Sequence, residues 1–200
     1  MNHSISEAKK IFRENDGILR TNEAIEYGIS PRTLYEMRDA GVVYQLSRGL
    51  YQLSDAEPLS NPDLITVTKR IPKAVICLIS ALDLYGVTTQ IPHQVNIALP
   101  QSAEKPRLAH PPLDIIWLSA HIYKAGQNTR TIDGVEIKLY SLEKTIADCF
   151  KFRNKIGLDV AIEALKNYLE LPERNIDLLM ENAKIDRVTS RLSHYLEVLL

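Results

Sequence analysis

Residues 17–53 have the sequence GILRTNEAIEYGISPRTLYEMRDAGVVYQLSRGLYQL. Ser30 followed by Pro31 is a preferred helix start, because serine caps free backbone amides and proline fits the first helical position. Gly28 supplies a turn just before this start, and Gly41 is the expected end of the helix. The stretch therefore predicts a helix that follows a tight turn.

A shorter helix is expected before that turn, with Thr21 as its cap. After Gly41, residues 42–46 and 50–53 are predicted strands, joined by a short glycine turn at Ser47-Arg48-Gly49. Two helices joined by a turn and followed by a hairpin are the pattern of a winged helix-turn-helix. Such a unit commonly places its second helix in a DNA major groove.

Polar side chains on the second helix and at the hairpin tip are the candidate DNA contacts. Arg32 lies in the first turn of the helix, and its guanidinium can pair with guanine. Tyr35 lies one turn later, and Arg48 at the hairpin tip can reach a minor groove or a flanking phosphate. Hydroxyls at helix N-termini are further donors to phosphate. The predicted DNA-binding residues are Thr21, Ser30, Arg32, Thr33, Tyr35, Arg38 and Arg48.

The charge distribution limits how this segment could bind DNA. The chain has 24 Lys and Arg against 25 Asp and Glu, and residues 1–57 hold 7 of these cations against 9 of the acids. Bulk attraction therefore cannot explain binding, which must come from a few local groups. Glu36 and Asp39 share the face of Arg32 and would repel phosphates, so a protein-interaction module without DNA binding is the alternative.

A domain boundary is expected in residues 56–64, AEPLSNPDL, which are polar and contain two prolines. We predict a DNA-binding domain over residues 1–57 and a C-terminal domain over residues 62–200. In the second domain, hydrophobic periodicity predicts helices and strands. The expected helices cover 63–70, 74–85, 141–152, 158–169 and 185–200, and the expected strands cover 94–99, 113–118 and a hairpin over 129–140. The predicted fold class is α+β, with a small sheet and several helices in the C-terminal domain.

One set of charged residues suggests an enzyme. Asp114 on one strand, with Glu136 and Lys138 on another, resembles the acidic and ExK elements of metal-dependent nucleases, in which carboxylates hold Mg²⁺. Simple alternation of buried and exposed residues along a strand explains Glu136 and Lys138 equally well. We favour that explanation and expect no enzymatic activity, metal or cofactor.

A basic cluster surrounds the end of the predicted helix over 141–152. It consists of Lys144, Lys151, Arg153 and Lys155. Cations at this position often only complement the helix dipole, but a partner-binding role is the alternative.

Other sequence features indicate an ordinary cytoplasmic protein. Cys77 and Cys149 lie far apart in apolar surroundings and are expected to be buried thiols. No apolar run approaches the roughly 20 residues of a membrane span, and the N-terminus lacks a signal-peptide core.

The whole chain resembles the AbiEi antitoxin family of bacterial toxin–antitoxin systems. The resemblance rests on VICLISALDLYGV at residues 75–87, on IDGVEIKLYSLEKTIADCFKFRNKIGLDVAIEAL at residues 132–165, and on SRGLY at residues 47–51. Its most specific part is residues 140–165.

This resemblance implies an N-terminal domain that binds double-stranded operator DNA, usually at inverted repeats, and represses its own operon. It also implies a C-terminal domain that counteracts a co-encoded nucleotidyltransferase toxin, directly or indirectly. Because one copy offers few cations, we expect a homodimer on paired half-sites.

Overall fold

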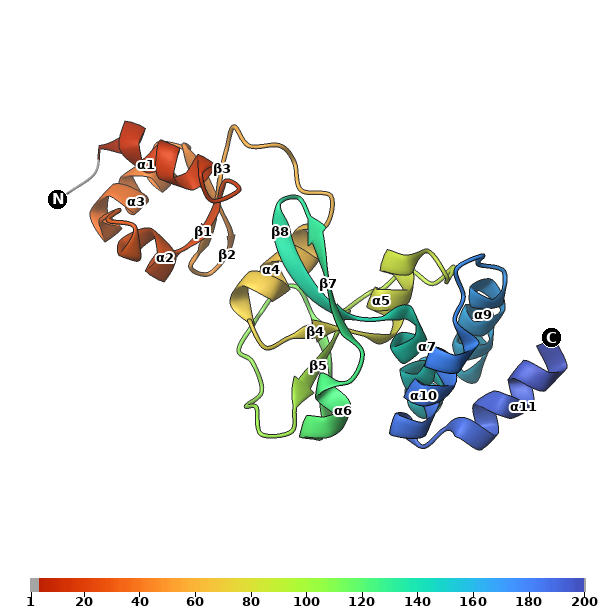
Figure 1. The fold of residues 1–200 in the computed structure, drawn as a ribbon. Coiled ribbons are helices and arrows are strands. Elements are labelled where there is room, and N and C mark those ends of the chain that lie inside the picture. The colour runs from red at the N-terminus through yellow and green to blue at the C-terminus, as the bar shows by residue number, and fades with distance from the viewer. Residues whose placement is uncertain (1–3, 200) are drawn as a thin grey trace. The chain divides into compact units, whose positions relative to one another are not determined.

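The structure is a computed structural model that describes residues 4–199 (Figure 1). These residues form two compact units. The N-terminal unit comprises the chain up to Pro72 together with residues 131–136, and the C-terminal unit comprises residues 73–130 and the chain from Ile137 onward. The sequence placed the domain boundary between residues 57 and 62, whereas the structure groups residues 58–72 with the N-terminal unit.

The N-terminal unit combines helices with a small antiparallel sheet. Its helices are α1 (Ile5–Arg13), α2 (Thr21–Glu26), α3 (Pro31–Asp39) and α4 (Pro62–Arg70). Its strands are β1 (Ile18–Arg20), β2 (Val43–Ser47) and β3 (Leu50–Leu53), in the order β1-β3-β2. The predicted helix pair and hairpin therefore correspond to α2, α3, β2 and β3.

The buried face of α3 holds this unit together. Leu34 and Met37 are fully buried and pack in one cluster with Phe12 of α1 and Tyr51 of β3. Strand β1 pairs with β3 but was not predicted, because three residues are too few to show strand alternation. The sheet therefore has a third strand that connects α1 directly to α2.

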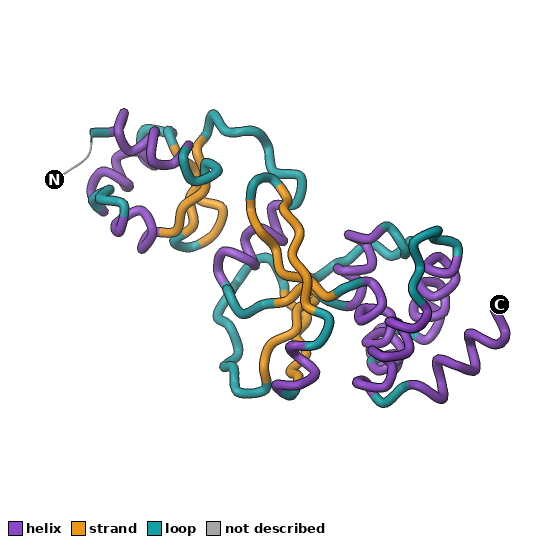
Figure 2. The backbone as a smooth tube through the Cα atoms, viewed as in Figure 1, coloured by secondary structure: helices purple, strands orange, loops and turns teal. Residues whose placement is uncertain are grey.

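Strands between residues 75 and 140 form a five-stranded mixed sheet (Figure 2). Its strands are β4 (Val75–Ile76), β5 (Val95–Pro100), β6 (Leu113–Leu118), β7 (Gln127–Ile132) and β8 (Val135–Tyr140), in the order β6-β5-β4-β8-β7. The helices of the C-terminal unit are α5 (Leu78–Tyr85), α6 (Ala120–Lys124), α7 (Leu142–Lys151), α8 (Arg153–Ile156), α9 (Leu158–Leu169), α10 (Ile176–Asp186) and α11 (Thr189–Leu199). The predicted α+β class is confirmed.

Two predicted helices are divided in the structure. Residues 74–85 form strand β4 and then α5, because Val75 and Ile76 pair with β5, and Ile76 also pairs with β8. A short buried strand and a buried helix share a continuous apolar sequence, so periodicity does not separate them. The predicted helix over 185–200 is interrupted at Arg187, whose φ of 58° is left-handed, and its last residue lies outside the described part of the chain.

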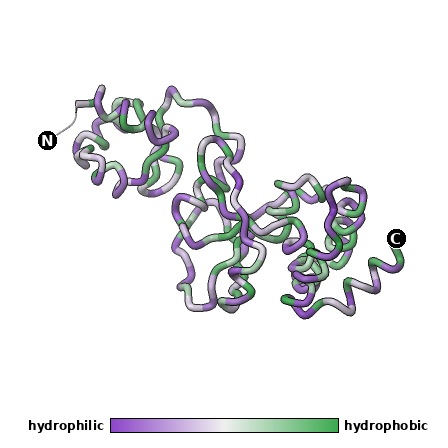
Figure 3. Tube along the Cα trace, viewed as in Figure 1, coloured by the Kyte–Doolittle hydropathy of each residue, from purple (hydrophilic) through white to green (hydrophobic). Residues whose placement is uncertain are grey.

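Hydrophobic residues are interleaved with hydrophilic ones along the helices (Figure 3). Among residues 4–199, no helix has the length and apolar character needed to cross a membrane.

A buried ionic network fixes α7 to α10. The Lys144 ammonium lies 2.5 Å from an Asp148 carboxylate oxygen on the same helix and 2.9 Å from Asp186 at the end of α10. All three side chains are completely buried. Lys151 adds a bond of 3.1 Å to the second oxygen of Asp186. Burying charge is costly unless the charges are paired, so each member depends on the others.

Asp148 is the least satisfied member of this network. Its second carboxylate oxygen is buried and has no hydrogen-bond partner among the described residues. Burial raises the pKa of Asp148 to about 7, against the opposing effect of the Lys144 ammonium. We therefore expect the stability of the network to depend on pH.

We predict that Lys144→Met strongly destabilises the fold at about pH 8, which is above the pKa of Asp148. Removing one partner of a buried ion pair leaves uncompensated charge and typically costs about 3–5 kcal/mol. Urea unfolding measures this loss. Lys166→Met on the exposed side of α9 is the control and should change stability by less than about 0.5 kcal/mol. Equal effects of the two substitutions would contradict the role of the network.

We also predict that Asp148→Asn flattens the pH dependence of stability. Because burial raises the folded pKa from 3.8 to about 7, the contribution of protonated Asp148 is fully present below about pH 4 and is lost as the pH rises through about 7. Between about pH 5 and pH 8, the free energy of unfolding should fall further for the wild type than for Asp148→Asn. Parallel pH profiles for the two proteins would reject this prediction.

Candidate nucleic-acid interface

The start of α3 is fixed by the hydroxyl groups of Ser30 and Thr33. The Ser30 oxygen accepts the backbone N–H of Thr33 at 3.0 Å, and the two hydroxyls are hydrogen-bonded at 2.8 Å. This is the predicted cap, followed by Pro31 at the start of the helix. Thr33 is only 7% exposed, so the structure places this predicted DNA contact in the cap and not on the outer face.

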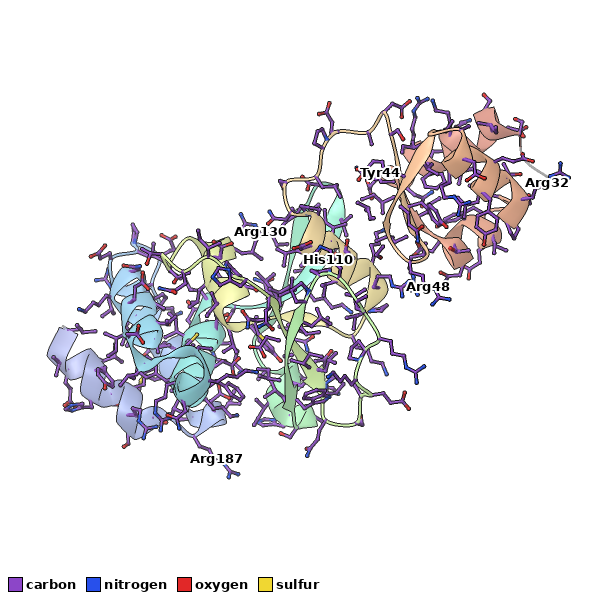
Figure 4. The ribbon with its side chains drawn as sticks, turned by 180° about the vertical axis from the view of Figure 1, so that it is seen from behind. Arg32, Tyr44, Arg48, His110, Arg130 and Arg187 are labelled. Atoms are coloured by element: carbon purple, nitrogen blue, oxygen red, sulfur yellow. The ribbon has the colours of Figure 1, made fainter. Side chains whose placement is uncertain are left out.

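The outer face of α3 carries Arg32, Tyr35 and Arg38. The Arg32 side chain is 86% exposed and extends away from the helix (Figure 4). The Tyr35 ring is also exposed, and the Arg38 guanidinium carbon lies 5.1 Å from the centre of this ring. The structure therefore brings three of the predicted contact residues onto one accessible helix.

Both arginines of this face are paired with acids. Arg32 Nε lies 2.9 Å from Glu36, one turn further along, and an Arg38 nitrogen lies 2.8 Å from its neighbour Asp39. The hydrogen bond to Asp39 raises the pKa of Arg38. The acidic residues that the sequence placed on this face are thus direct partners of its cations. They neutralise the face without covering it.

The β2–β3 turn presents Arg48 at the end of the hairpin (Figure 4). Gly49 has a φ of 73° and provides the left-handed conformation that the turn requires. Its carbonyl accepts the N–H of Thr21 at 3.0 Å, and the Arg48 carbonyl accepts a bond from the Arg70 guanidinium of α4. Two other elements therefore hold the turn in place.

The prediction for Thr21 needs a correction. Thr21 is the first residue of α2, and the cap position belongs to Arg20. Its backbone N–H is used by the turn, so Thr21 links α2 to the hairpin. Because threonine is a preferred cap residue, the sequence predicted this helix correctly but placed its first residue one position too late.

Arg20 and Arg70 are candidate interface residues that sequence reasoning missed. Arg20 ends the unpredicted strand β1, opposite Leu50, which directly follows the turn. Arg70 ends α4, beyond the domain boundary expected at residue 57. No local sequence signal marks either residue, because their proximity to the turn depends on strand pairing and on how α4 packs.

The predicted basic cluster in the C-terminal unit does not form one exposed patch. Lys144 is buried between two aspartates, and Lys151 binds one of them. Lys155 lies 2.5 Å from Asp114, and Arg153 donates to the carbonyl of Phe150. In the folded chain, acids from α10 and β6 pair with these cations. The residues next to the cations in the sequence do not predict these pairs.

The residues proposed for a nuclease site are also separated. Asp114 lies on β6, whereas Glu136 and Lys138 lie on β8, and strands β5 and β4 stand between them. Asp114 is already bound by Lys155 and by the amide of Asn96 at 2.9 Å. Within residues 4–199, no group of three or more His, Cys, Asp or Glu side chains could hold a metal ion.

The two cysteines are buried free thiols, as expected. Burial raises the pKa of both Cys77 and Cys149, which keeps them in the unreactive protonated form.

Comparison with known proteins gives a family-model match within the N-terminal unit and a similar fold for the chain. Residues 6–54 match the family model described as "Transcriptional regulator, AbiEi antitoxin". No curated protein matches the sequence. Among solved structures, the RV2827C protein from Mycobacterium tuberculosis is similar with a TM-score of 0.56 and 12% identity, over 98% of this chain and 82% of that one. At this identity, the likeness concerns the fold alone.

The matched residues extend from α1 through the helix pair to the end of the three-stranded sheet. The resemblance to AbiEi antitoxin transcriptional regulators is therefore confirmed over residues 6–54, the segment that carries α3 and the β2–β3 turn. The stretches at residues 75–87 and 132–165 lie outside this match.

Proposed function

We propose that this protein is a DNA-binding repressor whose α2, α3 and β2–β3 hairpin form a winged helix-turn-helix. The observation that carries the proposal is that the segment matching AbiEi regulators also presents Arg32 and Tyr35 on the accessible face of a capped helix. In this arrangement, α3 enters the major groove and the hairpin acts as the wing.

The energies of the competing contacts favour base recognition by Arg32. Its pair with Glu36 is exposed to solvent, and pairs of this kind contribute about 0–1 kcal/mol. A bidentate contact of arginine with guanine provides about 1–3 kcal/mol of discrimination. The pair with Glu36 is therefore weak enough for DNA to displace it. Tyr35 would contact a neighbouring base or phosphate, and Ser30, Thr21, Arg38 and Arg48 would position the backbone.

Two copies on an inverted repeat form the proposed working unit. The paired arginines of α3 leave each copy with few cations for phosphate contacts, so one copy should bind weakly. A symmetric dimer doubles the contacts and places its recognition helices one helical turn of DNA apart, or a multiple of it.

The match to AbiEi antitoxin regulators over residues 6–54 supports the antitoxin part of the proposal. The protein would act in the cytoplasm, repress its own operon and counteract a co-encoded nucleotidyltransferase toxin, directly or indirectly. The proposal includes no catalysis and no cofactor. Lys151, Arg153 and Lys155 remain proposed partner contacts of the C-terminal unit, whereas the burial of Lys144 removes it from that set. Restored growth in cells that express the neighbouring toxin gene tests this part.

We predict that Arg32→Ala weakens binding to the DNA upstream of the gene by about 1–3 kcal/mol and reduces discrimination against unrelated DNA. Glu36→Gln removes the competing carboxylate and should strengthen binding. A mobility-shift titration of the full-length variants measures both effects.

The control for this titration is Lys10→Ala, which removes an exposed cation of α1 that lies 3.8 Å from Glu14. It should leave affinity nearly unchanged. If Arg32→Ala and Glu36→Gln both bind like the wild type, α3 does not recognise DNA in the proposed way.

A further inference from the structure

The cations of the N-terminal unit divide into a paired and an unpaired set. Five of them have acidic partners within ion-pair distance. These are Lys9 and Arg13 with Asp55, Lys10 with Glu14, Arg32 with Glu36, and Arg38 with Asp39. In the described part of the chain, Arg20, Arg48, Lys69 and Arg70 form no ion pair. The unneutralised positive charge of this unit therefore comes from these four residues.

The three unpaired arginines lie on segments that adjoin the β2–β3 turn. Arg48 is part of the turn, and Arg70 binds its carbonyl from α4. Arg20 stands opposite Leu50 in the β1–β3 pair, immediately after the turn. These contacts bring together residues from three regions of the sequence.

Gly49 marks the centre of this arrangement. A Cβ atom placed on Gly49 would lie 3.3 Å from the Thr21 hydroxyl and 3.4 Å from a nitrogen of Arg70. The hydroxyl and the guanidinium therefore flank the same glycine, which has no side chain to separate them. Hydroxyl and guanidinium donors around an exposed backbone turn are the groups that proteins use for phosphate oxygens.

We infer that Arg20, Arg48 and Arg70, together with the Thr21 hydroxyl, form a phosphate-binding cluster at the β2–β3 turn. We call this set the turn cluster. The inference rests on the proposed DNA-binding function and divides it between two surfaces. The turn cluster supplies the sequence-independent attraction to the DNA backbone, and α3 supplies base recognition.

Arg70 has two roles in this account. One of its five N–H groups holds the Arg48 carbonyl, and the planar guanidinium retains further donors for a phosphate. Because Arg70 lies beyond residue 54, the DNA-binding surface extends past the segment that matches the family model.

The salt dependence of DNA affinity tests the turn cluster. Full-length wild type, Arg70→Ala and Arg70→Gln are titrated against the upstream DNA and against an unrelated duplex of equal length. Each lost phosphate contact should reduce the slope of log affinity against log salt by about 0.9 for each protomer. In both variants the slope should decrease by this amount. Their affinity for the two duplexes should fall by the same factor, because phosphates carry no sequence information.

Arg70→Gln removes the charge but keeps a polar amide on a shorter side chain, so its salt slope reports the charge of Arg70. A wild-type slope for Arg70→Gln would overturn the phosphate role and leave Arg70 as a positioning residue only. Wild-type affinity for Arg70→Ala would overturn the whole cluster. Unchanged thermal unfolding midpoints establish that both variants fold.

Further controls separate this inference from the proposed function. Lys10→Ala removes a paired cation of the same unit and should keep the wild-type slope. If Arg32→Ala weakens binding while Arg70→Ala and Arg70→Gln do not, the turn cluster is rejected and the DNA-binding function stands. If the folded wild type binds neither duplex at low salt, both are rejected.

Discussion

The ammonium of Lys144 between Asp148 and Asp186 is the interaction on which the C-terminal unit depends. It ties α7 to α10 with charges that have no access to water, so any change that separates the helices exposes unpaired charge. The apolar core surrounds the same helix, with Ile146 and Phe150 fully buried beside the network. Helix α7 is therefore the element around which this unit is organised. The sequence IADCF at residues 146–150 occupies this buried position.

In the N-terminal unit, the ion pairs lie on the surface and are not needed to hold the fold together. Exposed pairs stabilise the fold little, but they determine which cations are free to bind a polyanion. The arginines of α3 are matched by Glu36 and Asp39, whereas Arg48 and Arg70 have no acidic partner in the described chain. A unit without net positive charge can thus still present a local basic surface. The acidic composition of residues 1–57 is therefore compatible with the proposed binding of DNA through a few local cations.

Local signals in the sequence predicted much of this structure. The Ser30-Pro31 helix start and the turn at Gly49 are confirmed, because capping and turn chemistry depend on adjacent residues. The wrong predictions concern features that depend on tertiary contacts. Strand β1 is too short to show a pattern, β4 was included in a predicted helix, and Lys144 was counted as a surface cation.

The residues of the candidate site could likewise be predicted only where local sequence signals mark them. Arg32, Tyr35 and Arg48 follow from their places on a helix and a hairpin, and the structure presents all three at the surface. Arg20 and Arg70 lie near Arg48 only because β1 pairs with β3 and α4 reaches the turn.

Footprinting of the wild-type protein on the DNA upstream of its own gene tests the central claim most directly. The account predicts two protected half-sites related by an inverted repeat, with their centres about 10 base pairs or a multiple of this apart, and with protected backbone positions flanking each half-site. Absence of any protected site at low salt, with the protein folded, would contradict it.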